Sequence, residues 1–366
     1  MEKVTVIGVG KLGLCFALTL EKSGYDIIGV DVHEGYINSL NDKSFISDEM
    51  GVNDYLFNAK NFFVTKDLEV GLNHSNIIFL FVATPSLTDG RYDHSQIERI
   101  VSQLQVLGKN NKKRELIIGC TTMPEYCDTL VERLSPYGYQ ISYNPEFIAQ
   151  GSILRDLVNP DMVLIGEGTK KSGDLIENIY YDICENNPSI HRMNRKEAEI
   201  TKIALNCFLT TKIAYANMVG DIAKIAGCET EKILESIGSD SRIGSKNLKY
   251  GYGFGGPCFP RDNKAFYTYA DDLGYNAGIS KATEKSNNEH LIYQKDCFIR
   301  DNDKSRNYTF KNVTYKAGSV IIEQSQKLLL AVELARVGYK ITISDSQKVI
   351  DQIKELYDDL FNYEVL

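Results

Sequence analysis

The amino-terminal segment constrains the fold of this chain more than any other part. An apolar strand pattern over residues 4–7 leads through a glycine-rich turn into a helix pattern over residues 11–22, and a second strand pattern follows over residues 26–30. A strand, a helix and a strand within about thirty residues form a βαβ unit, which requires a parallel sheet with a right-handed crossover. The sequence therefore predicts an α/β fold that begins with a parallel sheet.

Further apolar segments extend this sheet. The runs at residues 77–82 and 116–120 are typical of buried parallel strands, and residues 94–108 between them have a helix pattern. Residues 141–143 and 162–165 are expected to be the last strands, joined by a loop rich in turn residues. We therefore predict a Rossmann-type, doubly wound domain at the amino terminus.

One long helix is predicted in the middle of the chain. Residues 195–225 contain no proline, and their apolar side chains recur at a helical spacing. At about 1.5 Å per residue, this helix would be roughly 45 Å long. That is too long for one small domain to cover, so we expect the helix to bridge domains or to pack against a second subunit.

The carboxy-terminal part predicts a second, weaker βαβ unit with too few elements for a full doubly wound sheet. Its expected elements are a strand over residues 308–315, a helix over 323–336, a strand over 339–345 and a helix over 347–357. The predicted organisation is a Rossmann domain over residues 1–190, a central helical domain over 191–290 and an abbreviated Rossmann-like domain over 291–366.

Composition argues against several classes of partner. The 41 Lys and Arg residues against 49 Asp and Glu residues leave a net charge of −8, so we expect no nucleic-acid or anionic-lipid partner. The longest apolar run, residues 77–83, has seven residues, whereas a membrane span needs about 20. A signal-peptide pattern is also missing, so a cytoplasmic protein is expected. The eight cysteines include no Cys-x-x-Cys pair, and we predict no metal site.

A glycine fingerprint follows the first strand. Gly8, Gly10 and Gly13 have the spacing G-x-G-x-x-G where the first helix begins. Such glycines permit a tight turn, a close approach of the backbone to a pyrophosphate, and close packing of helix on strand. Asp31, at the end of the second strand, would bind two ribose hydroxyls and repel an extra phosphate, which favours NAD over NADP. The alternative is a turn that binds another nucleotide or none. The predicted cofactor contacts here are Gly8, Gly10, Lys11, Leu12, Gly13 and Asp31.

A second glycine-rich segment surrounds a cysteine. Residues 251–262 place four glycines and two prolines around Cys258, and we predict that this segment is neither helix nor strand. Its backbone N–H groups would converge on an anion, and the adjacent Arg261 would favour a thiolate. Asp262 would lie near the thiol for proton transfer. The alternative is a buried structural cysteine.

This loop resembles the active-site signature G-F-G-G-x-C-F-x-x-D of the UDP-glucose/GDP-mannose (nucleotide-sugar) 6-dehydrogenase family. Other segments are similar to family motifs in the same order. They are residues 82–85 (V-G-T-P), 121–124 (S-T-V-P), 144–156 (N-P-E-F-L-x-E-G with a downstream acid), 199–208 (E-x-x-K-x-x-x-N-x-F) and 315–316 (Y-K-P). The resemblance covers nearly the whole chain, and within the family the motifs are most similar to those of UDP-glucose 6-dehydrogenases.

The resemblance implies oxidation of a primary alcohol to a carboxylate, with two NAD molecules used in turn and one water. Cys258 would trap the intermediate aldehyde as a thiohemiacetal and then carry a thioester. Lys202 and Asn206, four residues apart on the long helix, would stabilise an oxyanion. The resemblance gives water positioning and proton transfer to Glu146, Thr122 and Asp262, without assigning the base for hydrolysis.

The resemblance also implies the remaining contacts. Cofactor contacts are expected at Thr84, Pro85 and Thr122, and substrate contacts at Phe147, Ile148, Gln150, Lys202, Asn206, Arg242, Lys249, Tyr250, Gly255 and Lys316. Lys249 and Lys316 would be electrostatic partners of the diphosphate, and Arg242 would reach the substrate of the neighbouring subunit. The expected partners are therefore a nucleotide sugar and a second copy of the chain, which would form a homodimer on the helix over residues 195–225.

Two departures from the family pattern leave the sugar open. Gln150 replaces an acid, and Glu323 stands where the family has a sugar-contacting Arg. UDP-glucose is the expected substrate, with GDP-mannose or a UDP-N-acetylhexosamine as alternatives. Two other functions also stay open: a two-electron β-hydroxyacid-type dehydrogenase, which uses no cysteine, and a catalytically silent nucleotide-sugar-binding protein.

Overall fold

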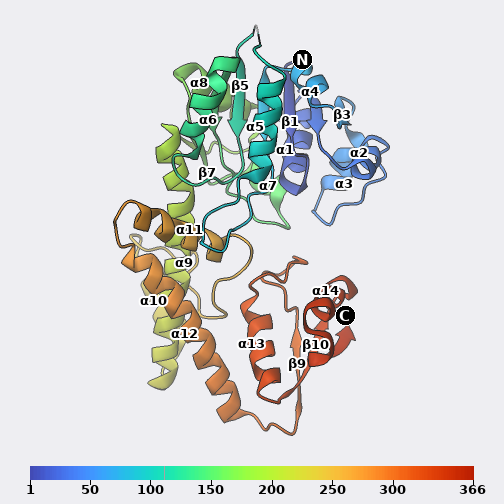
Figure 1. Ribbon diagram of the computed structural model, residues 1–366. Helices are drawn as coiled ribbons and strands as arrows, with labels where there is room; N and C mark the ends of the chain where they lie inside the picture. The colour runs from blue at the N-terminus through green and yellow to red at the C-terminus, as the bar shows by residue number, and fades with distance from the viewer. Residues whose placement is uncertain (111) are drawn as a thin grey trace. The chain divides into compact units, whose positions relative to one another are not determined.

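The computed structural model describes residues 1–110 and 112–366 (Figure 1). It divides into two compact units, Met1–Lys202 and Ile203–Leu366. The α/β architecture predicted from the sequence is confirmed, with a parallel sheet in each unit. The proposed division into three domains stays a prediction.

The first unit alternates strands and helices. Its strands are β1 (Lys3–Ile7), β2 (Asp26–Val30), β3 (Phe62–Thr65), β4 (Ile77–Leu80), β5 (Arg114–Ile118), β6 (Tyr139–Tyr143), β7 (Met162–Gly166) and β8 (Ser189–Met193). Its helices are α1 (Lys11–Lys22), α2 (Glu34–Asn41), α3 (Val52–Asn58), α4 (Leu68–His74), α5 (Ser95–Val106), α6 (Tyr126–Leu134), α7 (Ile153–Val158) and α8 (Lys170–Ile183), with a 3₁₀ turn, η1, at Ser135–Tyr137.

Within the described residues, eight strands form one sheet in the order β3-β2-β1-β4-β5-β6-β7-β8. The pairings are parallel except that of β6 with β7, which is antiparallel. The chain runs from β1 outward through β2 and β3, and then returns to β4 on the other side of β1. This reversal of strand order lies between β1 and β4, and open α/β sheets bind ligands at the carboxyl ends of the strands beside such a point.

Both faces of the sheet are buried, because successive side chains of a strand point to opposite faces. Val6 and Phe79 belong to one core cluster, together with apolar residues of α1, α7 and α8. Ile7 and Leu80 belong to a second cluster, together with residues of α5 and α6. Figure 1 shows the helices covering the sheet on its two sides. The sheet is therefore doubly wound, as predicted.

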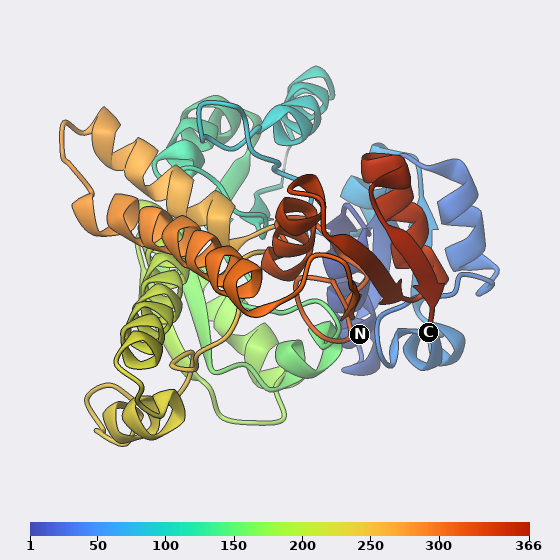
Figure 2. The same ribbon diagram turned by 90° about the horizontal axis from the view of Figure 1, so that it is seen from below.

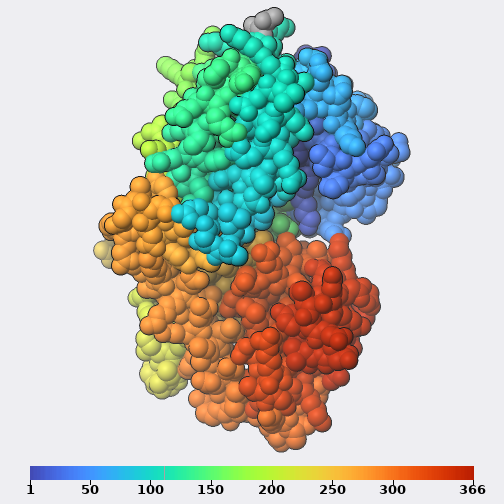
Figure 3. Space-filling model, viewed as in Figure 1, coloured from blue at the N-terminus to red at the C-terminus, as the bar shows by residue number. Residues whose placement is uncertain are grey.

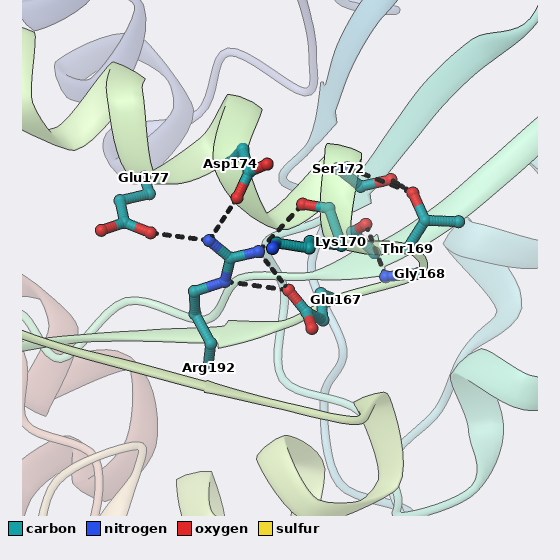
Figure 4. Close-up of polar contacts among 9 residues, drawn as sticks. Glu167, Gly168, Thr169, Lys170, Ser172, Asp174, Glu177 and Arg192 are labelled. Atoms are coloured by element: carbon teal, nitrogen blue, oxygen red, sulfur yellow. Dashed lines mark hydrogen bonds and ion pairs between the residues drawn. The ribbon is translucent and has the colours of Figure 1, made fainter.

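A cluster of charged side chains fixes α8 against the edge of the sheet (Figure 4). The guanidinium of Arg192, on β8, lies 2.6 Å from Glu167, 2.6 Å from Asp174 and 2.8 Å from Glu177. Glu167 follows β7, whereas Asp174 and Glu177 lie one turn apart on α8. A Cβ at Gly173 would lie 2.0 Å from Glu167 Oε2 and 2.4 Å from Arg192 Nη2, so α8 approaches the cluster through a glycine.

The second unit contains most of the long helix and a small sheet. Its elements are the rest of α9 (Arg195–Ile225), then α10 (Thr230–Gly238), α11 (Phe259–Asp272), α12 (Gly278–Asp301), β9 (Asn307–Lys311), α13 (Gln326–Arg336), β10 (Lys340–Asp345), α14 (Gln347–Tyr357), the 3₁₀ turn η2 (Asp358–Leu360) and β11 (Asn362–Val365). In the described part of the chain, three parallel strands form the sheet β11-β10-β9.

The small sheet packs against helices of the same unit. In Figure 2 the red helices α13 and α14 lie against the red strands, and in Figure 3 the orange surface of α12 adjoins the red segment. Phe298 of α12 has ring contacts with Tyr308 at 5.0 Å and with Tyr339 at 5.5 Å. These rings join α12 to the core that α13, α14 and the sheet share.

The long helix begins and ends where the sequence predicts, at Arg195 and Ile225. The segment between β6 and β7, expected to be a loop, contains the short helix α7, and β3, β8 and β11 were not predicted. The prediction for residues 251–262 was wrong in its last part, because α11 begins at Phe259. Pro260 lies in the first turn of α11, where a missing N–H costs no helical hydrogen bond.

Among the residues that the structure describes, no helix is both long and apolar enough to span a membrane.

Replacing Arg192 with Met is expected to lower the free energy of unfolding by about 2 kcal/mol at neutral pH, because three carboxylates then lose their shared cation. Hydrogen bonding to Arg192 holds the pKa of Glu177 below its usual value. This stabilisation is therefore present above the pKa of an unfolded Glu and is lost as the pH falls through the lower pKa of the folded state.

Urea denaturation of both proteins across a pH series measures this effect, and the difference between them should shrink in acid. Arg300→Met is the matched control, since Arg300 makes an exposed ion pair with its neighbour Asp301. A difference that stays constant into acid would contradict the role given to Arg192.

Candidate active site

Four motif segments follow neighbouring parallel strands. The glycine turn follows β1, residues 82–85 lie just after β4, residues 121–124 after β5 and residues 144–151 after β6. These four strands are adjacent and parallel, so their carboxyl ends lie at the same edge of the sheet. The topology therefore brings together segments that are more than a hundred residues apart in the sequence.

The glycine turn is closed to side chains at two positions and open at the third. Gly8 has a φ of +84°, and a Cβ there would lie 2.3 Å from the carbonyl oxygen of Phe81. A Cβ at Gly13 would lie 1.9 Å from the carbonyl oxygen of Gly8. In contrast, a Cβ at Gly10 would have no heavy atom of the described residues within 4 Å. Gly10 immediately precedes α1, so the open space faces the N–H groups of a helix amino terminus, which fits a pyrophosphate.

Backbone donors hold Asp31 at the end of β2. Its Oδ1 accepts from the N–H of Val32 at 2.8 Å and of His33 at 3.2 Å, and its Oδ2 accepts from the N–H of Val9 at 3.2 Å. Val9 belongs to the glycine turn. The carboxylate therefore lies directly beside the turn, where its charge and acceptor oxygens suit a ribose with free hydroxyls.

Thr122 lies at the carboxyl end of β5 and is fully buried. Its hydroxyl donates to Oε1 of Glu199 at 2.8 Å. Glu199 also accepts from the backbone N–H of Cys127 at 2.9 Å and of Glu125 at 2.8 Å. Burial raises the pKa of Glu199 above its usual value. This buried carboxylate joins α9 to the start of α6 and fixes the direction of the Thr122 hydroxyl.

Glu146 lies just after β6, with its carboxyl group turned into the protein. Desolvation raises its pKa to about 7, whereas any hydrogen bond that Tyr180 donates to the carboxylate, and the charge of Lys202, favour the ionised form. The Glu146 Oε1 atom lies 2.5 Å from the Tyr180 hydroxyl. A carboxyl group that titrates near neutrality suits acid and base chemistry at physiological pH.

Lys202 points at the same loop from α9. Its Nζ donates to the backbone oxygen of Glu146 at 2.6 Å and lies 4.3 Å from the ring centre of Phe147. Only 8% of the residue is exposed. The ammonium group is thus held where the loop after β6 meets the long helix, and its contact with substrate stays a prediction.

The other predicted contacts in the first unit differ in their surroundings. The Thr84 hydroxyl donates to the carbonyl oxygen of Thr121 at 2.8 Å, and Pro85 is exposed. Leu12 and Ile148 are partly buried against the first core cluster. Lys11 Nζ donates to Oε1 of Gln150 at 3.4 Å, which connects the glycine turn to the loop after β6.

In the second unit, hydrogen bonds connect three predicted catalytic residues, Cys258, Asp262 and Asn206. Cys258 is exposed and is the residue that directly precedes α11. One turn later, the Asp262 N–H donates to the Cys258 carbonyl oxygen at 2.8 Å. The Asp262 side chain is 1% exposed, and it accepts from Asn206 Nδ2 at 2.7 Å and from Arg261 Nε at 3.1 Å. A helix amino terminus favours a thiolate, so the thiol has a suitable environment for a nucleophile.

Two buried asparagines hold the glycine-rich loop that leads to Cys258. Asn287 accepts from the Phe254 N–H at 2.8 Å and donates to the Phe254 carbonyl oxygen at 3.0 Å. Asn217 accepts from the Gly251 N–H at 2.9 Å. A Cβ at Gly255 would lie 2.1 Å from the carbonyl oxygen of Gln324, so the loop packs tightly against the segment before α13. The loop is therefore a rigid support for the thiol.

The remaining substrate candidates have surroundings of different kinds. Arg242 is exposed and pairs with Asp240 at 2.7 Å, and Lys249 and Lys316 are also exposed. The Tyr250 hydroxyl donates to Asp221 at 2.8 Å. Their roles stay predictions.

Three organising residues were not predicted as site residues. Glu199 falls within the matched motif over residues 199–208, which was the one available signal. Tyr180 occupies a core position of the amphipathic helix α8, and nothing in its spacing distinguishes it. Glu49, which is 6% exposed, accepts from the N–H groups of Gly151 at 2.9 Å and Ile153 at 2.7 Å. Its partners lie a hundred residues away, so no local pattern could reveal it.

Comparison with known proteins gives matches along most of the chain. Residues 2–184 match the UDP-glucose/GDP-mannose dehydrogenase family, NAD binding domain, and residues 196–289 match the central domain of the same family. UDP-glucose 6-dehydrogenase of Rickettsia bellii is 28% identical over 370 residues, which cover 97% of this chain and 85% of that protein. UDP-glucose 6-dehydrogenase TuaD of Bacillus subtilis is 26% identical, over 99% of this chain and 81% of that protein.

Solved structures have the same fold. A UDP-glucose dehydrogenase from Pyrobaculum islandicum has a TM-score of 0.90 at 25% identity and covers 100% of this chain and 86% of that chain. A UDP-D-ManNAc dehydrogenase from Pyrococcus horikoshii has a TM-score of 0.81 at 22% identity, with 94% of this chain and 83% of that chain covered. These matches confirm the resemblance predicted from the motifs, and the matched NAD binding domain confirms the cofactor.

Gly10→Ala is expected to preserve folding and to weaken NAD binding roughly tenfold, or ~1.4 kcal/mol. Its φ of −62° suits any residue, but a methyl group would fill the space into which a pyrophosphate fits. Gly8→Ala is the comparison variant and is expected to destabilise the fold. The positive φ of residue 8 and the contact of the new methyl group with the Phe81 carbonyl oxygen should lower the free energy of unfolding by about 2 kcal/mol.

Thermal denaturation and calorimetric titration with NAD measure both effects. Unchanged NAD affinity in Gly10→Ala would contradict the placement of the pyrophosphate.

Proposed function

Because this chain belongs to the UDP-glucose/GDP-mannose dehydrogenase family, whose members are NAD-dependent, we propose that it oxidises the C6 primary alcohol of UDP-glucose to the carboxylate of UDP-glucuronate. The two curated relatives described above are named for UDP-glucose, as is the solved structure with a TM-score of 0.90. These names support UDP-glucose as the substrate. GDP-mannose and a UDP-N-acetylhexosamine are the alternative substrates, because Gln150 and Glu323 depart from the family pattern.

The observation that carries this proposal is the setting of Cys258. The thiol is exposed at the amino terminus of α11, within one turn of the buried pair formed by Asp262 and Asn206. Cys228 is also exposed, but it follows the carboxyl terminus of α9 rather than directly preceding the start of a helix. Helix polarity therefore supports Cys258 as the nucleophile.

Cys258 acts after the first oxidation has produced an aldehyde at C6. Its thiolate sulfur adds to the aldehyde carbon, and the carbonyl oxygen takes a proton to give a thiohemiacetal. The C–S bond keeps the aldehyde from leaving or hydrating. Oxidation of the thiohemiacetal then gives a thioester on the same sulfur. NAD, when bound at the glycine turn, would accept a hydride from the sugar carbon in each oxidation, while the proton of the attached hydroxyl passes to water.

Lys202 and Asn206 stabilise the oxygen on C6 during these steps. They lie four residues apart on α9, so their side chains leave the helix in similar directions. Lys202 presents an ammonium group beside the loop after β6, and Asn206 presents an amide that Asp262 orients. Each such donor is worth about 3 kcal/mol toward an oxyanion, judged from the deletion of comparable donors in other enzymes.

Hydrolysis of the thioester needs a base, and Glu146 is the best candidate. Its raised pKa of about 7 lets it release and accept a proton under physiological conditions. The water oxygen attacks the thioester carbon as Glu146 accepts one of its protons, and the C–S bond breaks to free the thiolate and the carboxylic acid, which then loses its proton to solvent. Thr122 lies in the same unit as Glu146, and its hydroxyl donates its hydrogen bond to Glu199. Thr122 is therefore suited to accept a hydrogen bond from the water.

We also propose a homodimer built on α9. Apolar side chains on one face of this helix are solvent-exposed in the single chain: Phe208, Tyr215, Met218, Ile222 and Ile225. Phe208 is 65% exposed and Ile225 is 73% exposed. A helix face of this kind is normally covered by a partner, and a second copy would cover it with the same face.

Cys258→Ser is expected to abolish production of the carboxylate, because an alkoxide cannot replace the thiolate at neutral pH. With UDP-glucose, the unmodified protein should release two NADH per sugar, and Cys228→Ser should do the same as the matched control. NADH absorbance and product analysis, run in parallel with GDP-mannose and UDP-N-acetylmannosamine, give both stoichiometry and substrate. Normal two-fold release by Cys258→Ser would disprove the covalent route, and faster oxidation of another sugar would change the substrate.

Phe208→Glu combined with Ile222→Glu is expected to convert a dimer into a monomer in sedimentation velocity. Each replaced side chain loses about 2 kcal/mol of apolar burial per chain and places a charge in the interface. Val106→Glu is the control, since Val106 is 87% exposed on α5. A monomeric unmodified protein at micromolar concentration would refute the dimer.

A further inference from the structure

The Glu146 carboxyl group belongs to a chain of buried hydrogen-bonding groups. If Glu146 is ionised, this chain has one donor proton too few for its acceptor oxygens. The Tyr180 hydroxyl lies 2.5 Å from Glu146 Oε1 and 2.8 Å from Asn144 Oδ1. Tyr180 is 2% exposed and Asn144 is fully buried. A tyrosine hydroxyl has a single proton, so it can donate to one of these two oxygens but not to both.

The orientation of Asn144 is fixed from its other end. Its Nδ2 donates to the carbonyl oxygen of Leu164, on β7, at 3.0 Å. The carbonyl of Leu164 accepts only, so the amide nitrogen must face it and Oδ1 must face Tyr180. Asn144 Oδ1 is thus an acceptor that needs the Tyr180 proton.

If Tyr180 donates to Asn144, its contact with Glu146 needs a proton on Glu146. The protonated carboxyl group then donates to the Tyr180 oxygen, and the three groups form a continuous chain that ends at Leu164. If Glu146 is ionised, Tyr180 turns its proton to Glu146, and the Asn144 and Tyr180 oxygens face each other at 2.8 Å with no proton between them. A buried acceptor left in that way is unfavourable.

The groups that face Glu146 act in different directions. The ammonium group of Lys202, on α9, favours the ionised form of Glu146, and desolvation favours the neutral form. Lys202 Nζ is bonded to the backbone oxygen of Glu146. Cys184, which follows α8, is a neutral thiol whose pKa is raised to about 11, mainly by burial and also by Glu146.

The Tyr180 hydroxyl is fixed beside Glu146, because helix α8 is held in place. Asp174 and Glu177 lie on the same helix, within the two turns before Tyr180, and both bind Arg192 on β8 (Figure 4). The Tyr180 ring itself packs in the first core cluster.

We propose that Tyr180 is a positioning residue that holds a proton on Glu146, by accepting a hydrogen bond from the carboxyl group while giving its own proton to Asn144. When Glu146 releases its proton to solvent, the Tyr180 O–H turns from Asn144 to Glu146, and no covalent bond other than the Glu146 O–H changes. The inference rests on the proposed function only in giving Glu146 a role in hydrolysis. The geometry supplies the proton arrangement itself.

Asn144→Leu tests the proposal, with infrared difference spectroscopy as the readout. The stretching band of the protonated Glu146 carboxyl group is identified by its loss in Glu146→Gln and is titrated with pH. Without Asn144 the Tyr180 proton is free to bind the carboxylate, so the pKa of Glu146 should fall by about one unit, a tenfold change in acid dissociation. In a Tyr180→Phe background, Asn144→Leu should leave that pKa unchanged.

Tyr180→Phe alone is the second test, should Asn144→Leu fold poorly. Phe keeps the packed ring but removes the acceptor of the carboxyl proton, so the pKa of Glu146 should fall. Tyr181→Phe is the matched control, since the neighbouring Tyr181 is exposed and donates to Glu177. A rise of the Glu146 pKa in Tyr180→Phe, or no change in Asn144→Leu, would overturn the proposal.

The activity measurements separate this inference from the proposed function. The low-pH limb of kcat for carboxylate formation should follow the infrared pKa in each variant, because Glu146 must be ionised to accept a proton from water. If the infrared pKa moves as expected but the protein releases no NADH from any nucleotide sugar, the proton arrangement stands and the proposed function fails. If two NADH are released and the infrared pKa does not move, the function stands and the role of Tyr180 fails.

Discussion

Parallel pairing of β1, β4, β5 and β6 is the constraint on which the site in the first unit depends. Four neighbouring strands that run in the same direction must present their next residues at one edge of the sheet. The glycine turn, Thr122 and Glu146 all follow such strands, so no special long-range interaction is needed to collect them. The buried carboxylates then refine this arrangement: Glu199 joins α9 to the start of α6, and Glu49 secures the start of α7.

Three buried carboxyl groups differ in the number of hydrogen bonds that they accept, and this difference suits them to different roles. Glu199 accepts two backbone N–H groups and the Thr122 hydroxyl, and Asp262 accepts from Asn206 and Arg261. Such carboxylates suit support and orientation. Glu146 shares the Tyr180 hydroxyl with Asn144, and desolvation dominates its titration. Desolvation raises the pKa of Glu146 to about 7, which suits this carboxyl group to gain and lose a proton near neutral pH.

Local patterns in the sequence predicted the elements whose cause is local. Helix α9 was predicted with about the right bounds because its apolar periodicity continues without a proline. The glycine turn was predicted because the turn itself requires glycines at this spacing. The start of α11 was missed because Pro260 was interpreted as a breaker, although proline is favourable in a first turn. Tyr180 and Glu49 could not be predicted, since their partners are brought near only by the folded sheet.

The position of Cys258 has a consequence for how the protein is oxidised during storage. Four other cysteines, at positions 15, 120, 127 and 207, are buried, and burial raises the pKa of each thiol, so peroxide meets them as unreactive neutral groups. Cys258, in contrast, is exposed and directly precedes α11, and the features that we propose for attack on an aldehyde also favour attack on an oxidant. If Cys258 is the nucleophile, as we propose, oxidation of its sulfur to sulfenic acid would stop turnover in stored protein while the fold remained intact.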